Sequence, residues 1–249
     1  MPASRVRGIA SLTNDLKPDI VFLLGDFAGG HRFVTGPVMP EEWGEALSIL
    51  NAPLGAYSVL GNHDWGHGPL PNLPADDADG VRRALRSANI EVLENHAVRV
   101  TKDGRPFWIA GLGDQLDGFV GPAGYTTRDD LDATLGQVKD KAPVILLAHE
   151  PYIFRRVPDR ISLTLCGHTH GGQIHVPIPL GPRFLRWQRV IRWQRELQKA
   201  YGHLVERDRH LIISPGLGTS YVPVRFNRPP EIVLVTLGRD PALSQQRRS

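Results

Sequence analysis

The sequence predicts an α/β domain in which sheet is covered by helices on both faces. Most of its apolar runs are continuous rather than alternating, which is typical of strands that are buried on both sides. Helical segments lie between these runs, and such alternation of strands and helices indicates a layered α/β architecture. With 249 residues, of which 41% are hydrophobic and 22% charged, the chain can bury a sizeable core.

The predicted elements follow one another along the whole chain. Short apolar runs punctuated by Gly, Pro and Asp predict strands at Asp19–Leu24, Tyr57–Leu60, Phe107–Ala110, Val144–Ala148, Ile161–Cys166, Leu211–Ile213 and Ile232–Val235. Helices are expected at Ser4–Leu16, Pro40–Leu50, Ala78–Ser87, Thr127–Val138 and Pro182–Tyr201. The stretches Pro71–Gly80 and Gly118–Thr126 are expected to be loops. We expect one domain over residues 1–238 and a disordered tail over residues 239–249.

Composition and charge exclude several classes of protein. The 29 basic and 26 acidic residues give a net charge of +3, so the pI of 9.2 reflects a small imbalance, not the charge of a nucleic-acid binder. The lone Cys166 excludes an intramolecular disulfide. No apolar run reaches the roughly 18 residues of a membrane-spanning helix, and the first residues lack the apolar stretch of a signal peptide. We therefore expect a cytoplasmic or peripherally membrane-bound protein.

One basic segment, Phe184–Tyr201, stands out from a nearly neutral chain. Four arginines recur in it at steps of three, at Arg186, Arg189, Arg192 and Arg195. One interpretation is a solvated helix face above an apolar core stripe. The other is a helix that lies on an anionic membrane surface or caps the active site. Binding of nucleic acid is not expected, because the rest of the chain is slightly acidic.

Polar residues of metal-binding type directly follow four of the predicted strands. These residues are Asp26, then Asn62, His63 and Asp64, then His149, and finally His168 and His170. In α/β sheets, ligands bind beyond the carboxyl ends of the strands, so residues far apart in the sequence can meet there. A mixture of oxygen and imidazole ligands suits Zn, Mn or Fe.

Each of these residues taken alone has a simpler explanation. Asp26 could cap a helix, Asn62 could lie in a turn, and His149 could be a half-buried histidine. Their common position at strand ends favours a metal site over a set of unrelated structural roles.

The series of motifs resembles that of the calcineurin-like metallophosphoesterases, whose motifs run DxH, GDxxD, GNH[DE], H and GHxH. This sequence has GD at Gly25–Asp26, GNHD at Gly61–Asp64, then His149, and GHTH at Gly167–His170. The stretches CGHTHGGQIHVP and ISPGLGTSYVPVRFNRPPEIVLVTL are similar to the branch of bacterial phosphodiesterases that includes YkuE and YaeI. The resemblance implies a four-layer fold in which helices enclose two sheets, with the metals at the strand ends.

The resemblance also implies a role for each residue. Asp26 would bridge two divalent ions (Mn, Zn or Fe), which hold a hydroxide for in-line attack on phosphorus. Asn62, His149 and His168 would complete the shell of one ion, and His170 would bind the other. His63 would act as general acid or as a donor to a phosphate oxygen, with Asp64 holding its ring.

Two departures from the family pattern are expected to matter. Gly29 stands where GDxxD has its second Asp, and His31 is a weak substitute for it. No DxH precedes Asp26, so we expect Met1 to be an internal methionine and the first strand to be missing. For the chain as given, one ion would keep four protein ligands, whereas the other would keep Asp26 and His170 and bind weakly.

The sequence therefore predicts a metal-dependent phosphoesterase, and more specifically a phosphodiesterase. A lipid-like or cell-envelope phosphodiester is the expected substrate class. The alternatives are a non-catalytic scaffold that keeps the fold, and a nuclease whose affinity for DNA would fall steeply with salt. The substrate itself, the metal and the oligomeric state stay open.

Overall fold

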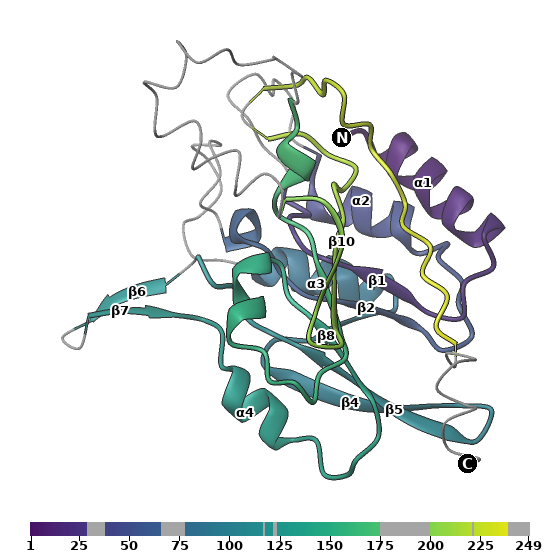
Figure 1. Ribbon diagram of the computed structural model, residues 1–249. Coiled ribbons are helices and arrows are strands. Elements are labelled where there is room, and N and C mark those ends of the chain that lie inside the picture. The colour runs from purple at the N-terminus through teal and green to yellow at the C-terminus, as the bar shows by residue number, and fades with distance from the viewer. Residues whose placement is uncertain are drawn as a thin grey trace, which may run out of the picture.

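The computed structural model describes residues 1–28, 38–65, 78–116, 118–121, 124–174, 200–220 and 222–238. Two sheets form the centre of this part of the chain, and helices lie on their outer faces (Figure 1). The predicted helix at Pro182–Tyr201, the tail at 239–249 and the residues Gly29 and His31 fall wholly or largely outside these ranges.

The first sheet is parallel and has three strands, in the order β1 (Val21–Leu23), β2 (Ala56–Ser58) and β3 (Ile90–Val92). Three helices cover its outer face: α1 (Ala3–Asp15), α2 (Pro40–Leu47) and α3 (Asp79–Ser87) (Figure 1). Each of the last two helices turns an apolar stripe toward the sheet. In α3 that stripe consists of Val81, Ala84 and Leu85, which are spaced at helical period and buried.

The second sheet has six strands and is mixed. Its order is β10 (Gly202–Glu206), β11 (Arg209–Ile213), β9 (Leu163–Cys166), β8 (Val144–Leu147), β5 (Arg105–Gly111) and β4 (His96–Lys102). The four inner strands run parallel, and an antiparallel strand lies at each edge. Strands β8 and β9 are buried along their whole length, in agreement with their continuous apolar sequences.

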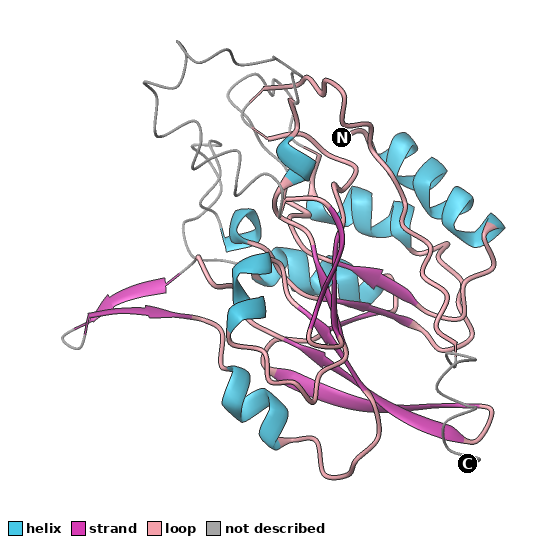
Figure 2. Ribbon diagram, in the orientation of Figure 1, coloured by secondary structure: helices cyan, strands magenta, loops and turns pink. Residues whose placement is uncertain are grey.

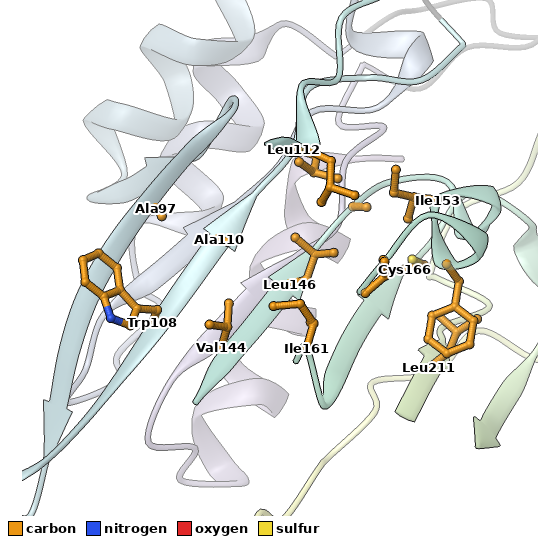
Figure 3. Packing of buried hydrophobic residues seen from close by; sticks show 14 of the residues in the cluster. Ala97, Trp108, Ala110, Leu112, Val144, Leu146, Ile153, Ile161, Cys166 and Leu211 are labelled. Atoms are coloured by element: carbon orange, nitrogen blue, oxygen red, sulfur yellow. The ribbon is translucent and has the colours of Figure 1, made fainter. Parts of the chain in front are cut away.

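The apolar core lies in three layers that match this architecture. One cluster packs between the two sheets and includes Val59, Ile109 and Leu147. A second lies between the first sheet and its helices. The third covers the outer face of the second sheet, under α4 (Leu131–Gly136) and the short helix Pro151–Arg155 (Figure 3). The predicted sequence of layers, helix, sheet, sheet and helix, is confirmed.

The stretch Gly118–Thr126 is not the loop that its composition predicted. It forms most of an antiparallel hairpin, β6 (Gly118–Gly121) and β7 (Gly124–Thr127), which projects from the body of the molecule (Figure 2). Gly is frequent in loops, but here Gly118, Gly121 and Gly124 belong to the two paired strands.

The predicted strand at Ile232–Val235 was wrong. Residues 231–238 run extended beside α1 without entering either sheet (Figure 1). Val233 and Leu234 are 40% and 58% exposed. An apolar β-branched run becomes a strand only where a sheet edge pairs with it, and the sequence of the run does not reveal that. Within the described ranges, no helix has the length and apolarity needed to cross a membrane.

Candidate metal centre

Four polar side chains meet where strands of the two sheets end. Asp26 follows β1, and Asn62 begins the short helix Asn62–Trp65 after β2, so both come from the three-stranded sheet. His149 follows β8 and His168 follows β9, which are neighbours in the six-stranded sheet. All four strands are parallel members of their sheets, so the side chains gather at the carboxyl edge.

The donor atoms of these side chains converge. Asp26 Oδ2 lies 3.1 Å from His149 Nε2, and His168 Nδ1 lies 3.1 Å from Asn62 Oδ1. One ligand atom from each of Asp26, His149 and His168 lies within 4.8 Å of the other two. A carboxylate, an amide oxygen and two imidazoles in this space fit a divalent ion such as Zn, Mn or Fe.

The glycines that precede Asp26 and Asn62 are required by close packing. A Cβ on Gly25 would lie 2.6 Å from the backbone nitrogen of Gly61 and 2.7 Å from Nδ1 of His149. A Cβ on Gly61 would lie 2.5 Å from Oδ1 of Asp26. Any larger residue at these two positions would push the ligands apart.

Three of the predicted ligands have backbones in the left-handed region, which non-glycine residues seldom adopt. The φ angles are 61° at Asp26, 67° at His168 and 50° at His170. Such conformations cost free energy and cluster at functional sites, where the surrounding structure holds them. At these three positions the fold tolerates a strained backbone conformation, and that conformation sets the direction of each side chain.

The hydrogen bonds of His149 and His63 orient the centre. Nδ1 of His149 donates to the carbonyl of Leu24, which directs Nε2 toward Asp26. The backbone N–H of His63 donates to Oδ1 of Asp26 over 3.0 Å. Nδ1 of the His63 ring is buried and has no hydrogen-bond partner in the described part of the chain.

Asp64 does not hold the ring of His63 as predicted. Its carboxylate accepts three backbone hydrogen bonds, from Asp26 and Ala28 at 2.8 Å and from Gly61 at 2.9 Å. Burial, and then the neighbouring Asp26, raise the pKa of Asp64 to about 7. Asp64 therefore ties the loop after β1 to the loop after β2.

Trp65 closes the same short helix with a buried indole ring. The guanidinium of Arg128 stacks 3.6 Å from the centre of the ring, and that of Arg82 lies 4.7 Å from it. Trp65 is 6% exposed. The two cations hold the ring in place. They thereby also fix the short helix that begins with Asn62 and His63.

The charges within the centre are coupled. Burial opposes the change, but His149 and His63 lower the pKa of Asp26 below its usual value. Burial likewise opposes the change at His149, but Asp26 raises its pKa to about 10. Burial, and then His149, lower the pKa of His168 to about 4. Asp26 and His149 each favour the charged form of the other across the 3.1 Å between Oδ2 and Nε2.

His170 lies beside this cluster rather than within it. Its Nδ1 is 3.4 Å from the carbonyl oxygen of Gly218 and 3.4 Å from Nη2 of Arg225. Burial, and then Arg225, lower the pKa of His170, whereas Asp26 acts in the opposite direction. His170 therefore does not belong to the group of converging donor atoms formed by Asp26, His149 and His168.

Comparison with known proteins places these residues in a family. A model of the calcineurin-like phosphoesterase family matches residues 5–172, a range that contains every predicted ligand. The chain belongs to this family. The assignment makes it a hydrolase that acts on phosphoester bonds.

Bacterial relatives match this phosphoesterase over most of its length. The metallophosphoesterase YkuE of Bacillus subtilis is 29% identical over 232 residues, which cover 90% of this chain and 69% of YkuE. The phosphodiesterase YaeI of Escherichia coli is 29% identical over 238 residues, which cover 95% of this chain and 77% of YaeI. The UDP-2,3-diacylglucosamine pyrophosphatase LpxG of Chlamydia trachomatis is 26% identical over 264 residues, covering 94% and 78%. The resemblance to the branch with YkuE and YaeI is confirmed.

Two groups near the centre of this phosphoesterase escaped the sequence analysis. Glu150 is fully buried beside His149, with Oε1 4.0 Å from Nδ1 of His168. Burial, with the nearby Asp114, raises its pKa to about 8. Arg225 comes from a segment that carried no metal-binding motif. The pair His149–Glu150 in one buried stretch was a signal for the first group. Arg225 lies within ISPGLGTSYVPVRFNRPPEIVLVTL, whose resemblance to the family was a signal for that segment but not for this residue.

Proposed function

We propose that this phosphoesterase is a metal-dependent phosphodiesterase whose active site is built on Asp26, Asn62, His149 and His168. The convergence of their donor atoms at the carboxyl edge of two sheets carries the proposal. The relative named as a phosphodiesterase, YaeI, supports the reaction class.

The metal requirement follows from the donor set. Asp26, Asn62, His149 and His168 would hold one divalent ion, and Asp26 with His170 would hold a second. When bound, such ions polarise phosphoryl oxygens and supply a nucleophile at neutral pH. Zn, Mn and Fe all suit these ligands.

His63 is the proposed proton donor to the leaving oxygen. Its backbone is fixed by the hydrogen bond to Asp26, which places the residue beside the ligand that both ions would share. Its ring, with Nδ1 unpartnered among the described residues, is not committed to a structural contact. A protonated imidazole there would stabilise charge that develops on the phosphate and then protonate the departing alkoxide.

A lipid-like or cell-envelope phosphodiester is the proposed substrate class. The name of LpxG describes a pyrophosphatase of a diacylated sugar nucleotide, and this supports a substrate with acyl chains. The basic segment Phe184–Tyr201 would bring such a substrate to the site from an anionic membrane surface. Residues 184–199 of this segment lie outside the described ranges.

The deciding experiment removes the imidazole of His63. We expect H63A, assayed with bis-p-nitrophenyl phosphate and Mn²⁺, to lose at least about 100-fold in kcat while its metal content stays that of the parent. H96A, which truncates an exposed histidine on β4, is the matched control and should keep full activity.

Two results would contradict the proposal. H63A could hydrolyse the substrate as fast as the parent, which would remove His63 from the mechanism. Alternatively, the metal-loaded parent could be inert toward every phosphodiester offered, which would favour a scaffold that keeps the phosphoesterase fold.

A further inference from the structure

The guanidinium of Arg225 donates hydrogen bonds to backbone carbonyls of two loops that are far apart in the sequence. Its Nε donates to Gly218 over 2.7 Å, and Nη2 donates to Pro215 over 2.7 Å and to Gly216 over 3.2 Å. Its Nη1 donates to the carbonyl of His170 over 3.3 Å. One guanidinium thus joins the loop after β11 to the loop that carries a predicted metal ligand.

The side chain of Arg225 is less exposed than those of the residues on either side of it. The flanking Val224 and Phe226 are 52% and 53% exposed, whereas Arg225 is half-buried. A second arginine, Arg228, donates from Nε to the carbonyl of Gly171 over 2.6 Å. The segment that carries Arg225 and Arg228 therefore donates hydrogen bonds to the carbonyls of two successive residues, His170 and Gly171.

The hydrogen-bonding chemistry of His170 distinguishes its two neutral tautomers. The carbonyl of Gly218, 3.4 Å from Nδ1, can only accept, so it selects the tautomer with a proton on Nδ1. In that tautomer the lone pair of Nε2 is free for a metal ion. The guanidinium of Arg225, also 3.4 Å from Nδ1, can only donate and would select the opposite tautomer.

The contacts of Arg225 decide between these two outcomes. Its Nε is 2.7 Å from the Gly218 oxygen, and its Nη2 is 2.7 Å from the Pro215 oxygen, so the guanidinium is already engaged by acceptors at short range. The 3.4 Å contact with the imidazole is the weaker alternative for Nη2. The Gly218 carbonyl is thereby held next to an imidazole that can donate to it.

We propose that Arg225 is a positioning residue that fixes the Gly218 carbonyl against His170 and so holds the imidazole in the tautomer that offers Nε2 to a metal ion. In this role Arg225 acts on His170 through the carbonyl. The proposal rests on the proposed role of His170 as a metal ligand, and it explains how a ligand outside the main cluster is prepared for binding.

The first test needs no metal. Long-range ¹H–¹⁵N correlation spectra of the metal-free, ¹⁵N-histidine-labelled protein report which ring nitrogen of His170 carries the proton. We expect Nδ1–H in the parent and in R99A, a control that removes a half-exposed arginine on β4. We expect R225A to show a mixture of tautomers.

The second test measures metal affinity by calorimetric titration with Mn²⁺ alone. We expect R225A to weaken the weaker binding step by about 10- to 100-fold while the tighter step stays within about twofold of the parent. R225K keeps the charge but donates to fewer carbonyls. Its Mn²⁺ affinity in the weaker step should therefore lie between those of the parent and R225A. If R225A does not fold, R225K carries both tests.

Two results would overturn the proposal. The parent could hold His170 in the Nε2–H tautomer, or a folded R225A and R225K could both keep the parent's tautomer and both Mn²⁺ affinities. Failure of the phosphodiesterase proposal alone would leave the metal-free tautomer measurement unchanged, so the two failures are distinguishable.

Discussion

Asp64 shapes the centre through the backbone rather than through its neighbour in the GNHD motif. Its two oxygens accept from three backbone N–H groups on two loops. These N–H groups would be left without an acceptor if the carboxylate were removed, and an unsatisfied buried donor costs free energy. The residue therefore matters to the geometry of Asp26 even without contact to substrate.

We expect D64A to lower the free energy of unfolding by about 3 kcal/mol, because three donors lose one shared acceptor. Mn²⁺ affinity should fall with it, since the loop that carries Asp26 loosens. Urea unfolding and calorimetric titration measure the two effects. D15A, which truncates an exposed residue at the end of α1, should stay within about 0.5 kcal/mol of the parent. A D64A protein as stable as D15A would refute this role.

The residues that meet at the centre were readable from the sequence, but their partners were not. Asp26, Asn62, His149 and His168 each follow an apolar run, and the ends of parallel strands meet by geometry. Their role as ligands stays a prediction. Arg225 and the backbone contacts of Asp64 depend on how loops fold against one another, and no local pattern encodes that arrangement.

Among the elements, β5 packs tightly at its last residue, Gly111, against the segment that follows β3. A Cβ there would lie 2.3 Å from Cβ of Leu93 and 2.7 Å from its carbonyl oxygen. No side chain can enter this space unless β5 moves away from the segment that follows β3. The position of the sheets thus depends on the absence of a single methyl group.

G111A should destabilise the protein by about 1–3 kcal/mol through overpacking. G136A is the control, because a Cβ on that residue of α4 meets nothing within 4 Å. Alanine also favours the helix, so G136A should be neutral or more stable by up to about 1 kcal/mol. Thermal and urea unfolding of both variants decide the matter, and equal stabilities would contradict the close approach.

Asp140 joins β5 to the turn before β8 and gives stability a dependence on pH. Its Oδ1 accepts from Nε1 of Trp108 and from the N–H of Ala142, both over 2.9 Å. These hydrogen bonds, together with Arg99, lower its pKa. A lowered pKa means stability that is present above the unfolded-state pKa near 3.8 and is lost as the pH falls through the folded-state value.

The variant D140N should therefore be less stable than the parent at pH 7, and the difference should shrink as the pH falls below 4. Asparagine keeps one acceptor oxygen but carries no charge, so the variant isolates the ionised form. Urea midpoints measured from pH 7 to pH 3 provide the test. A difference that stays constant over this range would show that the charge contributes nothing.

The elements themselves were predictable where an apolar run was both long and paired. Six of the seven predicted runs overlap strands of the two sheets. Strands β3, β4 and β10 were missed because charged residues interrupt their apolar sequences, and the run Ile232–Val235 found no edge to join. Pairing is a property of the whole sheet, so composition alone could not settle these cases. That residues 1–238 form one domain stays a prediction.

At the scale of the whole molecule, the centre spans both sheets. Asp26 and Asn62 come from the three-stranded sheet, and His149 and His168 come from the six-stranded sheet. An ion bound by all four would link the two layers directly. Metal binding should therefore stabilise the entire fold, since only the folded chain brings the four ligands together.

Removal of metal should lower the melting temperature of the protein by roughly 5–10 °C. Saturation at about 100 times the dissociation constant contributes about 2.7 kcal/mol, and each kcal/mol shifts a domain of this size by about 2–4 °C. Scanning calorimetry with Mn²⁺ and with EDTA measures the shift. H149A should show almost none, and an equal shift in H149A would place the stabilising ion elsewhere.

The indole of Trp65, which both Arg82 and Arg128 contact, gives the molecule a built-in optical probe. Trp65 belongs to the same single turn of helix as Asn62 and His63, and its surroundings are apolar and cationic. Any rearrangement of that turn changes the field at the ring and so the colour and yield of its emission. Loading of the centre can then be followed without a label or a substrate, as the difference in emission between the parent and W65F, because the other four tryptophans contribute equally to both.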